Sequence, residues 1–131
     1  EGEAALNLKA LLSAGCAVKE VNSSNLASVA KNIKKSHAII DALLGTGIKG
    51  EVSADYAVVI NIINASRVFK ISVDMPSGLC ADTGRVLGSC VKADMTVTFL
   101  ARKKGMLINE GPGYCGEILI KGLGVPLKLL K

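Results

Sequence analysis

The strongest constraint on the fold is the regular alternation of short apolar segments with segments of helical periodicity. Helices and strands are expected in turn at residues 4–13, 16–21, 24–33, 37–40, 53–63 and 68–73, with two more strands at 95–100 and 117–121. Parallel strands need long crossover connections, which are usually helices. The order therefore predicts the α/β fold class, with a mostly parallel sheet and helices on its faces.

Apolar stripes and capping residues support the helices. Leu8, Leu11 and Leu12 follow Ala4 on one side of the first helix, and Gly15 stands where a left-handed C-cap is expected. The later helices carry similar stripes and follow serines that can act as N-caps, namely Ser23 or Ser24, and Ser53. The stripes of the second and third helices have the pattern of a one-sided buried face.

The composition disfavours several classes of protein. The chain has 131 residues, half of them hydrophobic, which suits one compact domain or a part of one. The longest apolar run, residues 56–60, is too short for a transmembrane helix, and the opening residues do not resemble a signal peptide. Four cysteines without C-x-x-C spacing and a single histidine disfavour a zinc site. Reduced thiols and a cytoplasmic location are expected.

The net charge of +5 is compatible with an anionic partner. Binding to nucleic acid is disfavoured, because the basic residues are scattered and the chain has only two Tyr, two Phe and no Trp for base stacking. No nucleic acid or membrane partner is expected. One basic cluster follows an expected strand end, where it would meet phosphates or form a solvated loop: Arg102, Lys103 and Lys104.

Two aspartates stand at the expected carboxyl ends of strands, where open parallel sheets bind ligands. Asp41 follows the strand at 37–40, Asp74 follows the strand at 68–73, and each leads into a glycine-containing turn. If the two strands pair, they lie ~4.8 Å apart, so the carboxylates would be neighbours. The alternative is that each aspartate only caps its own turn. Two such positions together favour a site.

The segment 45–50 has glycine at three of six positions and precedes an expected helix. Glycine lets backbone amides approach an anion, and a helix N-terminus favours phosphate. The segment matches neither the dinucleotide fingerprint nor the P-loop pattern, since Glu51 follows Gly50. An ordinary strand-to-helix loop is an equally good interpretation.

Ser77 lies three residues after Asp74 and offers a hydroxyl near both aspartates. A Ser-His-Asp hydrolase is disfavoured, because His37 stands at the start of its strand and so at the wrong end of the sheet. A hard cation held by Asp41, the Ser77 hydroxyl and loop carbonyls is chemically sensible. The alternative is that Ser77 only satisfies its own turn.

Several motifs in one order resemble the NAD(P)H-hydrate epimerase family, the YjeF N-terminal domain. They are DALLGTGIKG at 41–50, VDMPSGL at 73–79, ADTG at 81–84 and ADMTVTF at 93–99. The opening EGEAALNL at 1–8 and the closing GEILI at 116–120 and GVP at 124–126 are also similar. The resemblance covers nearly the whole chain.

The resemblance implies a Rossmann-like three-layer α/β/α fold and the interconversion of the R and S epimers of NAD(P)H hydrate. Asp74 would be the catalytic acid/base and would also contact the substrate. A potassium ion would be held by Asp41 and Ser77. The substrate-binding loop would be Gly45, Thr46, Gly47, Ile48, Lys49, Gly50 and Glu51. A carboxylate can perform such acid–base chemistry if its pKa is raised toward the working pH. A neighbouring Asp41 would raise this pKa, and a bound cation would lower it.

This sequence departs from the family pattern at two places. The family's N-terminal strand and its Asn-Asn-Gly-Gly-Asp-Gly loop have no counterpart here, and Lys103-Lys104-Gly105 stands where the family usually has Lys-Pro-Gly. Residues 1–126 are therefore expected to form part of the family domain and to be inactive alone. Residues 127–131 would be a tail or linker, leading in a bifunctional protein to an ADP- or ATP-dependent dehydratase.

Two further expectations follow. The alternative to the enzyme is a non-catalytic module of the same fold that binds a nucleotide or a protein. Without the family's N-terminal strand, apolar parts of the sheet would be exposed, so a homodimer or higher oligomer is expected.

Overall fold

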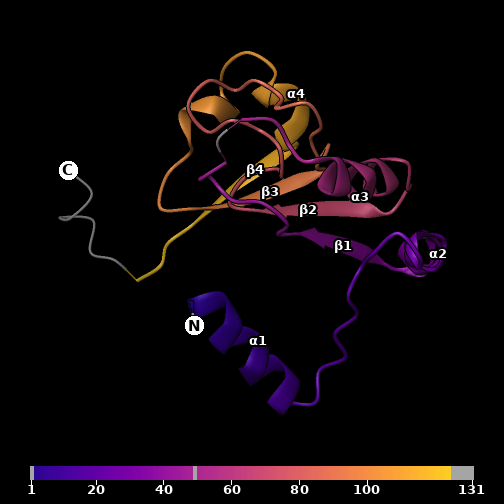
Figure 1. Cartoon of the computed structure of the whole chain (residues 1–131). Helices are drawn as coiled ribbons and strands as arrows, with labels where there is room; N and C mark the ends of the chain where they lie inside the picture. Colours follow the sequence, from indigo (N-terminus) through magenta and orange to yellow (C-terminus); the bar gives the residue numbers. More distant parts are fainter. Residues whose placement is uncertain (1, 49, 125–131) are drawn as a thin grey trace.

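The computed structural model describes residues 2–48 and 50–124, and its central element is a four-stranded sheet (Figure 1). The strands lie side by side in chain order: β1 (Ala38–Asp41), β2 (Phe69–Val73), β3 (Met95–Phe99) and β4 (Glu117–Lys121). The helices are α1 (Glu3–Ser13), α2 (Leu26–Lys35), α3 (Ala54–Asn64) and α4 (Gly111–Cys115), with a 3₁₀ turn at Lys104–Met106. All three strand pairs are parallel, which confirms the predicted α/β, Rossmann-like class.

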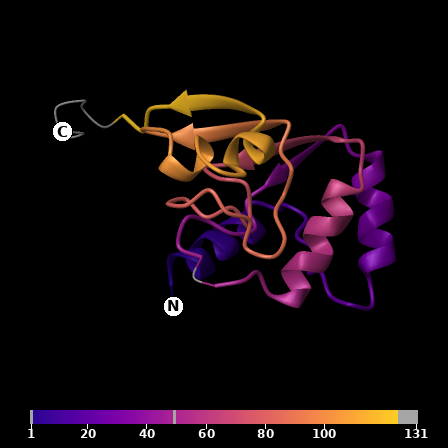
Figure 2. The same ribbon diagram turned by 90° about the horizontal axis from the view of Figure 1, so that it is seen from above.

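The core lies on one face of the sheet, beneath α3, α4 and the long connection between β2 and β3 (Figure 1). Ile60 and Ile63, one turn apart on α3, pack with Val91 and with Ile39 of β1. Helix α2 lies beside α3 at the edge of the sheet (Figure 2). A second buried cluster forms under α4 and consists of Met75, Leu79, Cys90, Met106 and Cys115.

The covered face of the strands carries buried polar side chains as well as apolar ones. Asp41, Ser72 and Thr96 are register partners on three neighbouring strands, so their side chains share this face. The Ser72 hydroxyl donates to Asp41, and the Thr96 hydroxyl donates to the Cys115 carbonyl at 2.6 Å. These buried polar side chains are tolerated because each has a hydrogen-bond partner.

The opposite face is apolar and open. Ile40 is 61% exposed and Phe69 is 47% exposed, and Ile71 and Val97 are only half-buried. Helix α1 lies on this side, apart from the sheet, and contains no buried residue (Figure 1). Helix α1 confirms the expected helix and its left-handed Gly15, and its leucine stripe is exposed.

The expected strand at 16–21 is also wrong, because this segment is irregular and exposed. A strand needs a neighbour to pair its backbone groups, and β1 at the sheet edge pairs only with β2 among the described residues. The expected serine caps also differ. Helix α2 begins after Asn25, and Ser53 occupies the N-cap of α3 without a side-chain capping bond.

Helix α4 and the 3₁₀ turn have no counterpart in the sequence-based expectation. Gly111 and Pro112 open α4; glycine disfavours a helix, whereas proline is well suited to the first turn, where its missing N–H would have no intrahelical partner. The helix forms where Gly111 packs so closely on Gly105 that a Cβ at Gly111 would lie 1.8 Å from the Gly105 carbonyl oxygen. Within residues 2–48 and 50–124 every helix is too short to cross a membrane.

Candidate active site

Strands β2 and β3 end in the same kind of tight turn. Asp74 directly follows β2 with a φ of +66°, and a hydrogen bond of 2.8 Å from the Met75 amide to the Val73 carbonyl closes a three-residue turn around it. Leu100 follows β3 with a φ of +65°, and the same bond joins its two neighbours at 2.8 Å. Positive φ values are strained for such residues, and strain of this kind is concentrated at functional sites.

The turn holds one oxygen of the Asp74 carboxylate and leaves the other free. Oδ1 accepts hydrogen bonds from the Thr98 hydroxyl at 3.1 Å, the Phe99 amide at 3.1 Å and the Lys103 ammonium. Oδ2 has no hydrogen-bond partner among the described residues. Asp74 is 27% exposed, so Oδ2 is accessible to a ligand at the carboxyl end of the sheet.

Lys103 is fixed by three acceptors. Its ammonium donates to Asp74 Oδ1, to the Thr98 hydroxyl at 3.0 Å and to the Phe99 carbonyl at 3.1 Å. Burial raises the pKa of Asp74, but the Lys103 ammonium together with the Phe99 and Thr98 hydrogen bonds holds this pKa below its ordinary value. Asp74 is therefore a carboxylate at neutral pH.

Asp41 has a different environment. It is the last residue of β1, is 1% exposed, and uses both carboxylate oxygens. Oδ1 accepts the Ser77 hydroxyl at 2.6 Å and the Leu43 amide at 3.4 Å, whereas Oδ2 accepts the Ser72 hydroxyl at 2.7 Å and the Ser77 amide at 2.9 Å. Asp41 therefore ties β1 to β2 and to the turn that follows Asp74.

The surroundings of Asp41 suit a cation with oxygen ligands. The Ser77 hydroxyl lies 2.6 Å from Asp41 Oδ1 and 3.3 Å from the Leu44 carbonyl oxygen, so three kinds of oxygen meet there. No basic side chain within the described ranges pairs with this buried carboxylate. Buried charges are normally paired or bind metals, so the donor set fits a cation such as potassium.

A hydrogen bond anchors each end of the glycine-rich loop, and the first of them joins the Asp41–Ser77 network. The Leu44 amide donates to the Ser77 hydroxyl at 2.9 Å, and the Val52 amide donates to the Leu87 carbonyl at 2.9 Å. Between these anchors the loop is largely exposed, and a Cβ at Gly45 or Gly47 would meet no atom within 4 Å. Lys49, part of the expected substrate-binding loop, lies outside the described residues.

The structure thus brings Asp41, Ser77 and the start of the loop together, and places Asp74 in a second network toward β3. Strands β1 and β2 do pair, but no hydrogen bond between described residues joins the two carboxylates. Lys103, rather than Asp41, is the charged residue that shifts the pKa of Asp74. His37, which was placed at the far end of its strand, is exposed there.

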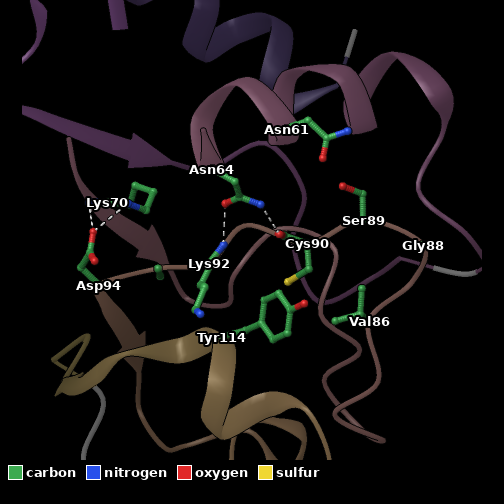
Figure 3. A pocket seen from close by; sticks show the side chains of 11 residues that line it. Asn61, Asn64, Lys70, Val86, Gly88, Ser89, Cys90, Lys92, Asp94 and Tyr114 are labelled. Atoms are coloured by element: carbon green, nitrogen blue, oxygen red, sulfur yellow. Dashed lines mark hydrogen bonds and ion pairs between the residues drawn. The ribbon is translucent and has the colours of Figure 1, made fainter. Parts of the chain in front are cut away.

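A separate hollow lies at the opposite end of the sheet (Figure 3). Its volume is about 400 Å³, and its walls include Asn64, Lys70 and Asp94. Asn64 holds the wall by donating to the Cys90 carbonyl and accepting from the Lys92 amide, both at 2.8 Å. None of the predicted site residues lines this hollow.

A comparison with known protein families shows which family the chain belongs to. Residues 1–105 match the family described as YjeF-related protein N-terminus. The chain belongs to this family. The resemblance of its motifs to the YjeF N-terminal domain is thereby confirmed.

Relatives of this YjeF-related domain are named as NAD(P)H-hydrate epimerases or repair enzymes. The chain is 40% identical over 124 residues to the NAD(P)H-hydrate epimerase of Elusimicrobium minutum, and the match covers 95% of this chain and 55% of the relative. It is 45% identical over 91 residues to the bifunctional NAD(P)H-hydrate repair enzyme Nnr of Coxiella burnetii, covering 70% of this chain and 19% of the relative. A third relative, the NAD(P)H-hydrate epimerase of Limosilactobacillus fermentum, is 43% identical over 88 residues, and the match covers 67% of this chain and 42% of the relative. The chain thus spans about half or less of these relatives.

Sequence reasoning missed two members of the site in this YjeF-related domain. Thr98 was assigned only to a strand, although its hydroxyl contacts both Asp74 and Lys103. Lys103 was singled out as a basic residue after a strand end, with phosphate or solvent as its partner, whereas the structure pairs it with Asp74. The signal that would have found Thr98 is its position one residue before the end of the strand next to β2.

Proposed function

We propose that this domain takes part in the epimerisation of NAD(P)H hydrate, interconverting the R and S forms of the damaged cofactor. The observation that carries the proposal is the 40% identity over 124 residues with an epimerase. The geometry supports it, because a strained, accessible carboxylate stands at the carboxyl end of the sheet.

Asp74 is the proposed acid/base residue. Epimerisation at the hydrated carbon requires a proton to leave and return, and a carboxylate within reach of the hydroxyl performs such a transfer. Asp74 Oδ1 is held by three donors, which leaves Oδ2 to contact the substrate. The loop of residues 45–51 is the proposed substrate-binding segment, because its glycines let backbone amides approach an anion and the loop lies between the Ser77 anchor and the N-terminus of α3.

The proposed potassium ligands are Asp41 and Ser77, with the Leu44 carbonyl beside them. A bound cation would supply positive charge next to the buried carboxylate and help hold the start of the loop. The chemistry at the substrate remains with Asp74, whose hydrogen bonds are separate from those of Asp41.

Potassium should raise the thermal stability of the protein, since a ligand that binds only the folded state stabilises it. The melting temperature should be higher in potassium chloride than in tetramethylammonium chloride of equal ionic strength. An Asp41→Asn variant should lose this difference, whereas Asp94→Asn, on the far side of the sheet, should keep it. Equal melting temperatures of the wild-type protein in both salts would contradict the proposed ion site.

Three other features of the natural protein belong to the same proposal. The open apolar face, with Ile40 and Phe69 exposed, supports the expected homodimer or higher oligomer. All four cysteines are free thiols, which supports a cytoplasmic location. A continuation into an ADP- or ATP-dependent dehydratase is also proposed, because relatives include bifunctional repair enzymes. The expected tail at 127–131 lies outside the described residues.

The deciding experiment is an epimerase assay on the complete natural protein that contains this domain. Purified R-NADH hydrate is supplied together with a dehydratase that accepts only the S form, and NADH is followed by absorbance. Faster conversion than the spontaneous rate would support the enzyme. A folded protein that leaves the spontaneous rate unchanged in the presence of potassium would favour the alternative, a non-catalytic nucleotide- or protein-binding module.

A further inference from the structure

The ion pair between Lys103 and Asp74 bears on whether Asp74 first accepts a proton from the substrate or donates one to it. The three hydrogens of the Lys103 ammonium all have acceptors, in Asp74 Oδ1, the Thr98 hydroxyl and the Phe99 carbonyl. Lys103 is only 23% exposed, so water competes little for these hydrogens. The lysine therefore fixes the carboxylate through one oxygen.

The charged side chains near Asp74 that do not bond elsewhere are positive, and positive charge favours the ionised carboxylate. Lys103 is the one basic side chain within ion-pair distance of it in the described part of the chain. Asp41, on the neighbouring strand, is bonded to Ser72 and Ser77 instead. Arg102 and Lys104, which flank Lys103, are exposed and add positive charge. No acidic side chain among the described residues opposes the pair.

We infer that Lys103 is a positioning residue that keeps Asp74 ionised, so that epimerisation begins with Asp74 removing the proton of the substrate hydroxyl. This inference rests on the proposed function. If Asp74 were an uncharged carboxylic acid, it would instead begin the reaction by protonating the substrate hydroxyl, and this hydroxyl would leave as water. The Lys103 contact makes the ionised form the resting one.

The base-first route opens the hydrated ring without releasing water. Asp74 Oδ2 accepts the hydroxyl proton, the carbon–oxygen bond becomes a carbonyl, and the bond between that carbon and the ring nitrogen breaks. The electron pair of this bond goes to the nitrogen, which receives the proton back from Asp74. Rotation of the aldehyde and the reverse transfers close the ring on the other face. Nothing is oxidised or reduced, and Asp74 ends as a carboxylate.

The pH dependence of kcat/KM tests the role of Lys103, because this quantity reports the ionisation of the free enzyme. Activity that needs the carboxylate is present above the pKa of Asp74 and is lost as the pH falls through it. Replacing Lys103 with Met removes an interaction that lowers this pKa and leaves the burial that raises it. The acidic limb of the profile should therefore move to higher pH.

Two matched variants complete this test. Lys103→Arg keeps the positive charge and should keep the acidic limb near its wild-type position. Lys104→Met removes the neighbouring exposed charge and should leave the limb unchanged. Circular dichroism confirms that each variant is folded. An unmoved acidic limb in folded Lys103→Met would overturn the positioning role, and so would an equal shift in Lys104→Met.

The incorporation of oxygen from the solvent distinguishes the base-first route from loss and re-addition of water. In H₂¹⁸O, the base-first route retains the original oxygen during the first turnovers, whereas loss and re-addition of water puts one ¹⁸O into each epimerised molecule. We expect retention, measured by mass spectrometry of the S product. Incorporation of about one ¹⁸O per turnover would overturn the base-first route while leaving the epimerase function intact. Absence of enzymatic conversion would instead refute the proposed function itself.

Discussion

An Asp74→Asn variant of the natural protein should keep its fold and epimerise NAD(P)H hydrate about 10²- to 10⁴-fold more slowly. The amide cannot accept the substrate proton, which removes the proposed acid–base step. Asparagine tolerates positive φ better than most residues, so the turn at φ +66° should persist. The Asn side-chain oxygen can still accept from the Phe99 amide and the Thr98 hydroxyl. The coupled dehydratase assay measures the rate, and circular dichroism checks the fold.

Asp94→Asn is a closely matched control for this variant. Asp94 is also paired with a lysine, because Lys70 donates to its Oδ2 at 3.1 Å, and its pKa is lowered by the Lys70 hydrogen bonds and charge against the raising effect of burial. It stands at the opposite, amino end of β3, so its loss should leave the epimerisation rate unchanged. Similar losses in both variants would show that the Asp74 effect comes from the fold. An active Asp74→Asn enzyme would remove Asp74 from the chemistry.

Replacing Asp41 with alanine should lower the free energy of unfolding by about 3 to 5 kcal/mol. The carboxylate is buried and accepts the hydroxyls of Ser72 and Ser77 and the amide of Ser77. In the variant these three buried donors lose their acceptor, and each unsatisfied group costs about 1 to 3 kcal/mol. Urea denaturation of the natural protein, followed by circular dichroism, measures the change.

The control for this variant is Asp55→Ala. Asp55 is exposed in the first turn of α3, where its interaction with the helix dipole contributes about 0.3 to 1 kcal/mol. If Asp41→Ala were no more destabilising than Asp55→Ala, the hydrogen bonds of Asp41 would not be important for the fold. A large loss of stability in Asp41→Ala alone would show that Asp41 joins β1 to the turn after Asp74, whatever ion it also binds.

Local patterns in the sequence were sufficient for most of the elements. The apolar spacing of Leu26, Val29 and Ile33 correctly predicts α2 and the side that it turns to the protein. The strand expected at 117–121 has those bounds in the structure, β2 and β3 differ from the expected strands by one residue at one end, and β1 is shifted by one residue at both ends. Such patterns are reliable because side-chain spacing of 2 or 3.6 residues follows from the geometry of a strand or a helix alone.

Elements that depend on distant partners were predicted poorly. The segment 16–21 has the composition of a strand but pairs with no described strand, and α1 has a leucine stripe that stays exposed. Helix α4 begins at Gly111, a poor helix former, where this glycine packs closely on Gly105. In each case the outcome depends on what lies across space, which local spacing does not record.

The sequence by itself determined the parallel α/β architecture, and it placed Asp41 and Asp74 at the carboxyl ends of two strands, which the structure shows to be neighbours. The tertiary structure alone decided how the two aspartates differ. The partners of Asp41 lie 31 and 36 residues away in Ser72 and Ser77, and Lys103 lies 29 residues from Asp74. Hydrogen bonds over such separations depend on the packing of strands and turns. This packing buries the Asp41 carboxylate and leaves Asp74 Oδ2 without a hydrogen-bond partner in the described part of the chain.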